Sequence, residues 1–278
     1  MAIPYGWQEE VQFLPEVNYG EEDTSTPTVV AFRAVSFDLT CTDPPVQLGG
    51  VPGVPFGWRY DATRPREMKG VPDVSGSIVL ECEYDDLGWL LKNVLGDPTT
   101  TGSGPYTHTY TVASTVQDME QSFTIIRRTG QTRQAFYGCH IDAIEIGATN
   151  GEIAKVTVEV VGQTHDNAST QDAAGALSSA PFLEFHESSI RYHASTGTAS
   201  AEANNLDSGN QPSSWSWRFE KNLRKEAAAG TADSSNNLVR GIREPVPAGF
   251  FTSKLTFSRD WTNDNFYDMV FAEGTAGY

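Results

Sequence analysis

The chain has 278 residues, of which 38% are hydrophobic and 11% aromatic, a composition that excludes a wholly disordered protein. Its 36 acidic and 19 basic residues give a formal net charge of −17, which argues against tight nucleic-acid binding, because that requires Lys and Arg to displace counterions. The 25 glycines and 15 prolines favour a chain of strands and turns over a helical bundle.

The first 70 residues predict an arm, a strand and a long loop. Residues 1–28 are polar, with Pro and Gly, and are typical of an extended arm that needs a neighbour to settle it. Residues 29–41 are rich in β-branched and aromatic side chains and predict a strand. Residues 42–70 have no sustained period, and a loop of this length in a compact domain tends to be functional.

Residues 69–98 predict a strand followed by a short helix. Ile78, Leu80 and Cys82 alternate with Val79, Glu81 and Glu83, which indicates a strand with one apolar and one polar face. The period then changes to that of an amphipathic helix, with apolar residues at Leu87, Leu90, Leu91, Val94 and Leu95. Asp85 or Asp86 is placed to cap its N-terminus, and Gly96 and Pro98 to end it.

The rest of the chain predicts more strands. They are expected at 106–113, 122–130, 136–148, 153–163, 182–185, 188–194 and 213–223. Residues 166–181 are rich in Ala and Ser and read as a linker, and a polar loop is expected after 223.

The end of the chain repeats the strand and helix of residues 69–98. Val246-Pro247, Leu255 and Phe257 match Val71-Pro72, Leu80 and Cys82 at a constant offset, with Thr252, Lys254, Thr256 and Ser258 on the outward face. A second helix is expected around Phe266, Met269 and Val270, and residues 213–220 correspond to the strand at 34–41. This echo suggests a duplicated unit.

We therefore expect a mainly β fold, a β-sandwich or partial barrel that is duplicated and carries short flanking α-helices. The first module with its N-terminal arm would span 1–165, the linker 166–181 and the second module 182–278, packed together as one compact unit.

Enzymatic and metal sites have little support in this sequence. The acidic corner around Glu81, Glu83, Asp85 and Asp86 has neither the converging carboxylates of a hydrolase nor the loop of a calcium site. Neither a GxSxG elbow nor a phosphate-binding glycine loop occurs. Cys41, Cys82 and Cys139 include no CxxC pair, so we expect free buried thiols. We expect no enzyme activity, no cofactor and no metal; a hydrolase using Glu81, Glu83 or Glu145 stays as an alternative.

Targeting signals are also missing from the pattern. The N-terminus has no signal-peptide pattern, and no apolar run approaches the roughly 20 residues that span a bilayer. We expect a soluble protein made in a cytoplasm, with no membrane partner.

The order and texture of several segments resemble the tail tube (major tail) proteins of long-tailed viruses. The segments are "EVNYGEEDTSTPTVVAFRAVSFDLT", "GVPDVSGSIVLECEYDDLGWLLKNVLGD", "GPYTHTYT", "SFTIIRR", "YGCHIDAIEIGATNGEIAKVTVEVVG" and the closing "GFFTSKLTFSRDWTNDNFYDMVFAEGTA". They cover roughly the first 165 residues and residues 249–276.

The resemblance implies a structural virion protein of the tail, assembled in the host cytoplasm. Subunits of this family form rings whose inner strands join into one β-barrel channel, and the rings stack into a conduit for ejected double-stranded DNA. A duplicated subunit implies homotrimeric, pseudo-hexameric rings; a hexamer is the alternative. A tape-measure protein and a tail terminator are the implied partners. Another tail, baseplate or terminator component, or a carbohydrate-binding β-sandwich, are the alternative functions.

Two sets of residues are candidates for these roles. The polar faces of the strands place Glu81, Glu83, Glu145, Thr157 and Glu159 toward the channel, where acidic groups would repel phosphate. The aromatic residues of the long loop and the arm are expected to stack rings or join subunits: Trp7, Phe13, Phe56, Trp58 and Tyr60.

Overall fold

The computed structural model describes the greater part of the chain. The described residues are 9–22, 29–42, 45–47, 67–69, 72–104, 106–112, 122–129, 132–166, 177, 179–187, 191–192, 204–205, 212–232 and 238–258. The residues expected to form the second helix and most of the expected linker lie outside these ranges.

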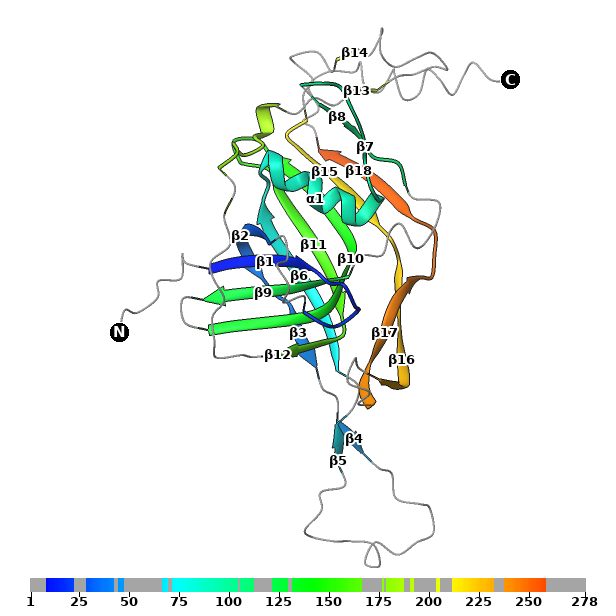
Figure 1. The fold of residues 1–278 in the computed structure, drawn as a ribbon. Coiled ribbons are helices and arrows are strands. Elements are labelled where there is room, and N and C mark those ends of the chain that lie inside the picture. The colour runs from blue at the N-terminus through cyan, green and yellow to red at the C-terminus, as the bar shows by residue number, and fades with distance from the viewer. Residues whose placement is uncertain are drawn as a thin grey trace, which may run out of the picture.

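Strands dominate the described residues, which confirms the expected mainly β fold (Figure 1). Ten strands form one hydrogen-bonded system in the order β11-β6-β2-β1-β9-β10-β15-β18, with β12 beside β10 and β3 beside β6. Their bounds are β1 Glu9–Pro15, β2 Val30–Phe37, β3 Thr40–Thr42, β6 Asp73–Glu81, β9 Phe123–Thr129, β10 Thr132–Thr149, β11 Lys155–Gly162, β12 Thr164–Asp166, β15 Ser214–Glu220 and β18 Thr252–Ser258.

Shorter elements decorate this system. Four ladders pair β4 Pro45–Gln47 with β5 Glu67–Lys69, β7 Thr99–Thr101 with β8 Thr107–Thr109, β13 Arg191–Tyr192 with β14 Asn204–Asn205, and β16 Leu223–Ala232 with β17 Leu238–Pro247. The helix α1 spans Tyr84–Leu95, and a 3-10 turn spans Phe185–Glu187.

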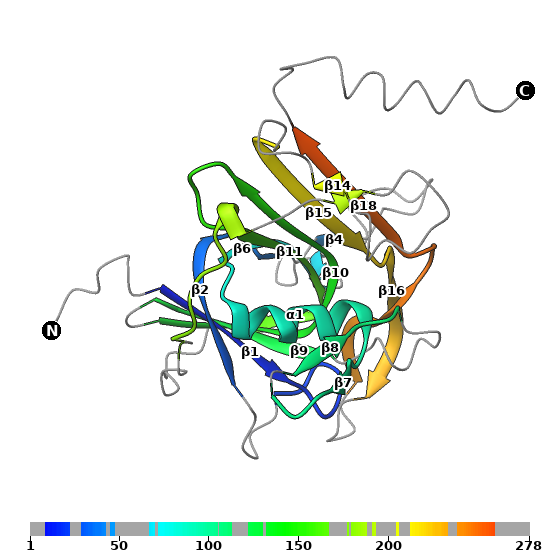
Figure 2. The same cartoon turned by 90° about the horizontal axis from the view of Figure 1, so that it is seen from above.

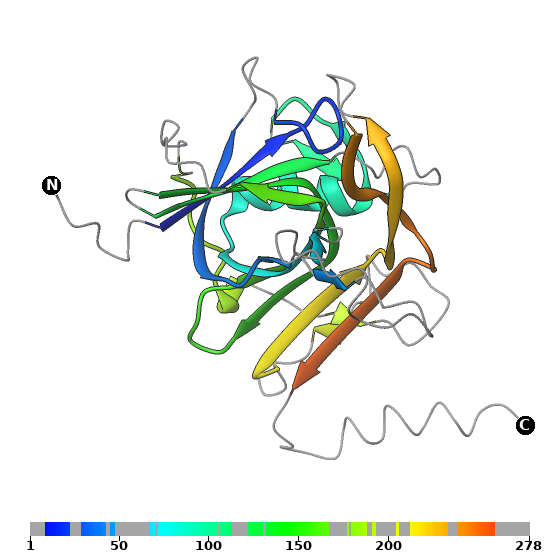
Figure 3. The same cartoon turned by 90° about the horizontal axis from the view of Figure 1, so that it is seen from below.

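The strands form two layers, one containing β1 and β9 and the other containing β6, β11 and β15, and the long strand β10 belongs to both. Its first half pairs with β9 and its second half with β11 and β15, so six strands (β1, β2, β6, β11, β10 and β9) close into a ring. In the view from above α1 lies in front of these strands, and in the view from below it lies behind them (Figure 2 and Figure 3). The bend in β10 lies at Gly138, whose φ is +64°, where the register with β9 shifts.

A buried carboxylate holds the chain against this bend. Glu16 follows β1 and accepts hydrogen bonds from the Gly20 and Gly138 backbone N–H groups, each at 2.9 Å, and from the Thr124 hydroxyl at 2.8 Å. Burial raises the pKa of Glu16, and these hydrogen bonds oppose that rise. The segment after β1 is therefore fixed to β9 and β10 by one side chain.

Aromatic rings fill the core between the layers and α1. Phe13 of β1 packs edge-on to Phe32 at 5.0 Å and to Trp89 of α1 at 5.3 Å between ring centroids. Since β1 lies between β2 and β9, residues 9–15 are an internal strand. This corrects the expectation that they belong to an arm needing a neighbour.

The helix α1 forms as its period predicts, with Leu90, Val94 and Leu95 buried. Its N-cap is Glu83, which makes no side-chain capping hydrogen bond, while Asp85 and Asp86 occupy the first turn. The N-cap therefore lies two residues before Asp85 and three before Asp86, which corrects the expectation that one of these aspartates is the cap. Gly96 ends the helix, donating its N–H to the Lys92 carbonyl, as expected.

Other expectations need smaller corrections. The polar loop expected after 223 is the hairpin of β16 and β17. Strand β16 is rich in Ala, and the ladder has two register shifts, so the hairpin carries no period-two signal. The strand expected at 106–113 is only β8, three residues long. None of the three cysteines forms a disulfide; Cys82 and Cys139 are buried, and Cys41 is partly exposed.

Candidate functional site

The strands β6, β11, β10, β15 and β18 form a layer, which we call the β6–β18 layer, with one polar face. Cross-strand register places Lys155 opposite Glu81, Thr157 opposite Glu145, and Glu159 opposite Ala143. Residues paired across a ladder share a face of the sheet. Four of the five predicted channel residues, Glu81, Glu145, Thr157 and Glu159, therefore lie on one surface.

The fifth predicted channel residue, Glu83, lies elsewhere. Strand β6 ends at Glu81, and the chain turns before α1, so the alternation that predicted an outward Glu83 stops too early. Its side chain is buried, with one carboxylate oxygen 3.7 Å from an Arg33 guanidinium nitrogen. The expectation that Glu83 faces a channel is corrected by this burial.

Arg218 of β15 is the centre of the charges on the polar face. It donates two hydrogen bonds to Glu159, at 2.6 and 2.8 Å, and lies 3.9 Å from Glu145 and 3.7 Å from Glu220. The guanidinium lowers the pKa of the Glu159 carboxyl by hydrogen bonding. Sequence reasoning missed Arg218, because only the pairing of β10 with β15 brings it to these glutamates.

The total charge of the face is small. The charged residues that the five strands place on the polar face are the acids Asp73, Glu81, Glu145, Glu159 and Glu220 and the bases Lys155, Arg218 and Lys254. Asp142 lies at a register shift and is not counted. Five negative and three positive side chains sum to −2, against −17 for the whole chain. The polar face is thus mildly negative and largely self-neutralised.

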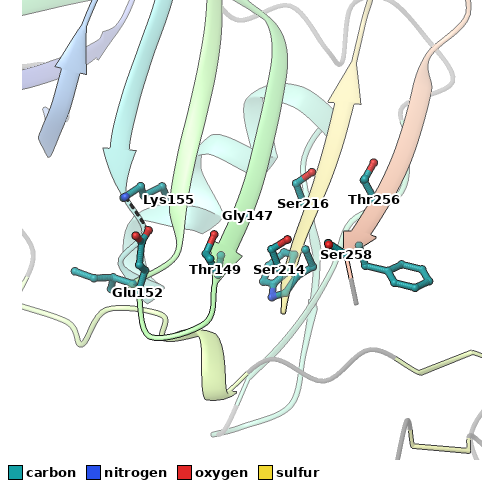
Figure 4. Close-up of a pocket in the computed structure, with 12 residues that line it drawn as sticks. Gly147, Thr149, Glu152, Lys155, Ser214, Ser216, Thr256 and Ser258 are labelled. Carbon is teal, nitrogen blue, oxygen red and sulfur yellow. Dashed lines mark hydrogen bonds and ion pairs between the residues drawn. The ribbon is translucent and has the colours of Figure 1, made fainter. Parts of the chain in front are cut away.

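One end of the polar face is lined by hydroxyl groups (Figure 4). Cross-strand register pairs Thr149 with Ser214 and Ser214 with Ser258, and it pairs Ser216 with Thr256. A depression of about 390 Å³ lies among these residues, beside the ion pair between Lys155 and Glu152 at 3.1 Å. Gly147 lies close to β15, since a Cβ there would be 2.9 Å from the Trp215 carbonyl oxygen. The absence of a side chain at Gly147 keeps this end of the face hollow.

Strand β18 ends the layer. It pairs with β15 along its whole length, and no other strand of the described residues pairs with it. All seven of its residues are exposed. A regular strand of this length presents a row of backbone N–H and C=O groups that a further strand can bind.

The aromatic candidates for stacking divide into two groups. Phe13 is fully buried in the core, so it offers no surface to another subunit, and the expectation for this residue is corrected. Trp7, Phe56, Trp58 and Tyr60 lie outside the described residues. The last three belong to the stretch of sequence between β4 and β5.

The part of the chain that the structure describes contains neither a metal-binding cluster nor a helix that could span a membrane. No group of three or more His, Cys, Asp or Glu is arranged there to hold a metal ion. None of the helices described is long and apolar enough to cross a membrane.

At the acidic corner, burial and the neighbouring Glu83 and Asp85 raise the pKa of Asp86 to about 6.

No curated protein matches the chain. The family model described as "Phage tail tube protein" matches residues 57–277, well over half of the chain. This range includes α1, all strands of the β6–β18 layer and the polar face built above. The chain therefore belongs to the phage tail tube protein family and is a structural component of the virion tail.

Proposed function

We propose that copies of this chain form rings that stack into a tail tube, and that the polar face of the β6–β18 layer lines a channel for double-stranded DNA ejected into the host. The observation that carries the proposal is that Glu81, Glu145, Thr157 and Glu159 share one face of a layer that ends in an exposed strand. The ring would form without enzyme chemistry.

The exposed strand β18 supports a ring closed by strand pairing. A sheet continued from subunit to subunit leaves no free edge once it closes into a barrel. Within the subunit, β2 pairs antiparallel with β6, and β15 with β18, and a β-hairpin interrupts each connection. Each subunit has two such units, so three subunits supply the six units of a ring. This favours a homotrimeric ring over the hexameric ring that subunits with a single unit would build.

The two hairpins support the stacking of rings. Hairpin β4/β5 and hairpin β16/β17 project from the same end of the molecule (Figure 1). We assign the contacts between rings to these hairpins, with Phe56, Trp58 and Tyr60 between β4 and β5 and with Trp7. Replacing residues 48–66 by a short Gly-Ser linker should leave single rings; full-length tubes from this variant would contradict the assignment.

The charge of the face suits a channel that DNA passes without binding. A sum of −2 per subunit repels phosphate weakly, while the hydroxyl groups at one end hold water. In the virion the channel would hold a tape-measure protein before ejection and be closed by a tail terminator, with assembly in the host cytoplasm.

Electron microscopy of the purified protein tests the proposal directly. We expect rings and tubes whose number rises with protein concentration, and class averages down the tube axis that show three subunits per ring. Six subunits per ring would contradict the trimer but would not contradict the proposal that the chain forms a tube. A protein that stays monomeric at every concentration and salt would contradict the tube itself.

A substitution tests which face lines the channel. Thr157→Lys adds a cation to the polar face, and Thr109→Lys, at an exposed site on β8, is the matched control. At low salt, tubes of the first variant should retain double-stranded DNA, while control and wild-type tubes should not. Equal retention by both variants would show that this face does not line the channel.

A further inference from the structure

The hairpin β16/β17 leaves the β6–β18 layer at a backbone irregularity. Asn222, between β15 and β16, has a φ of +56° and is the only non-glycine residue with a positive φ among those that the structure describes. Residues with a side chain rarely adopt this left-handed conformation, although Asn tolerates it better than most. Such a conformation persists where the surrounding structure holds it, so the contacts of Asn222 deserve a function.

Asn222 ties the two strands of the hairpin to each other at their base. Its side-chain amide donates a hydrogen bond to the Phe250 carbonyl at 2.7 Å, and its carbonyl accepts one from the Ala248 N–H at 2.9 Å. Gly249 lies between these two residues, and a Cβ there would be 3.2 Å from the Cβ of Asn222. The entry to β16 and the exit from β17 are therefore fixed to one residue.

Asp142 of β10 fixes this base to the rest of the subunit. The register of β10 with β11 shifts at Asp142, so this residue lies at a bulge. Its carbonyl accepts a hydrogen bond from the Lys221 N–H at 2.8 Å, and its carboxylate accepts one from the Leu223 N–H at 2.7 Å. Asp142 thus holds the residues on both sides of Asn222.

Two further contacts hold the hairpin against the first half of the chain. Lys225 lies at a register shift in the hairpin, forms an ion pair with Asp73, and donates a hydrogen bond to the Val74 carbonyl at 3.2 Å. On the other strand, Glu244 lies 3.7 Å from the Nε2 atom of His140. Strands β6 and β10 therefore each contact one strand of the hairpin near its base.

We propose that Asp142 and Asn222 form a clamp that sets the direction in which hairpin β16/β17 projects, and so positions it for contact with the next ring. The inference rests on the proposed stacking of rings through this hairpin. A ten-residue strand such as β16 is about 30 Å long, so turning its base by about 20° would move its far end by about 10 Å. The clamp residues act through the hairpin and are therefore positioning residues.

Distances between spin labels test the clamp in the single subunit, at protein concentrations where rings do not form. In a Cys41→Ser background the two remaining cysteines are buried, and labels at Thr231→Cys on β16 and Thr109→Cys on β8 report the direction of the hairpin. Asp142→Ala removes the carboxylate acceptor and should broaden the distance distribution at least twofold. Asp142→Asn keeps an acceptor oxygen for the Leu223 N–H and should leave its width unchanged.

A second variant tests the other half of the clamp. Asn222→Gly keeps the left-handed backbone and removes the side-chain hydrogen bond to the Phe250 carbonyl. It should also broaden the distance distribution at least twofold. Equal distributions in Asn222→Gly and the wild type would overturn the role of Asn222.

Electron microscopy measures the consequence for stacking. The wild type and Asp142→Asn should form tubes, while Asp142→Ala should form rings and shorten the mean tube length at least fivefold. Asp97→Ala removes an exposed carboxylate beyond the end of α1 and is the matched control, which should keep tubes of wild-type length.

The results of the two experiments separate the clamp from the proposed function. An unchanged distance distribution in Asp142→Ala would overturn the clamp, and so would full-length tubes from that variant. Loss of rings as well as tubes would also overturn it, because Asp142 would then support the whole subunit and not the direction of the hairpin. If the wild type forms no tubes, the proposed function fails, while the spin-label distances still decide whether Asp142 sets the direction of the hairpin.

Discussion

The buried ring of His140 should make the protein lose stability as the pH falls below neutral. His140 lies in β10, almost fully buried, with its Nε2 atom 3.7 Å from a Glu244 carboxylate oxygen of β17 and its ring 5.8 Å from that of Tyr19. Burial, and then the nearby cation of Lys221, lower the pKa of His140 to about 3.

The sign and size of the effect follow from this shift. Because the folded pKa lies below the unfolded value of about 6.5, the unfolded chain binds the proton more tightly at acidic pH. The contribution to stability is complete above pH 6.5 and is lost as the pH falls toward 3. One pKa unit corresponds to about 1.4 kcal/mol, so the free energy of unfolding should be about 2 kcal/mol lower at pH 5 than at pH 7.

A comparison with His140→Gln isolates this contribution. Burial raises the pKa of the Glu16, Asp142 and Glu244 carboxyl groups, which act in the opposite direction, but these groups are present in both proteins and cancel in the difference. Urea unfolding between pH 7 and pH 4.5 should show the steeper acid loss in the wild type.

The control removes an exposed histidine instead. His108→Gln, on β8, leaves His140 in place, so its stability should follow the wild-type pH dependence. If His140→Gln loses stability with acid as steeply as the wild type does, the burial argument for His140 is refuted.

Three further predictions concern stability. Glu16→Gln replaces one of the two acceptor oxygens by an NH2 donor, so at least one of the three hydrogen bonds to Glu16 is lost, and it should lower the free energy of unfolding by about 1–3 kcal/mol in urea titrations; a neutral effect would show that Glu16 does not hold the bend. Gly138→Ala should cost more than Gly151→Ala in thermal unfolding, since both have positive φ but only a Cβ at 138 meets neighbours, 2.9 Å away; equal costs would reject this packing argument. A double-mutant cycle of Arg218→Gln and Glu159→Gln should give a coupling of about 0.5–1 kcal/mol that shrinks in 1 M salt, and zero coupling would refute the pair's contribution.

Short sequence patterns predicted those helices and strands that form through contacts between residues close together in the sequence. The apolar period of 87–95 and the glycine at 96 were sufficient to place α1, because a helix is built from contacts within three or four residues. The alternation of 153–163 predicted β11, and its inward Val156, Val158 and Val160 are buried. The echo between the two parts of the chain showed a repeat of two strands separated by a long loop, and only the structure showed that a hairpin lies in each connection.

Pairing between distant segments decided the rest. The hairpin β16/β17 was missed because its stability comes from its ladder and not from a pattern of apolar residues. Phe13 was expected at a surface, since nothing in the first 28 residues shows that β2 and β9 enclose β1. Leu255 and Phe257 were matched to buried residues of the first unit, yet their exposure depends on where the cover of α1 ends.

The sequence by itself determined that this chain is mainly β, because alternation and turns are local properties that do not depend on the fold, and the resemblance of its segments to tail tube proteins indicated a structural role. Only the tertiary structure decided which glutamates share a face, since register carried Glu81, Glu145 and Glu159 together while the turn before α1 buried Glu83. It also placed Arg218 among those glutamates and left β18 at the end of the layer. These outcomes depend on strand pairing across long stretches of chain, which no short sequence pattern records.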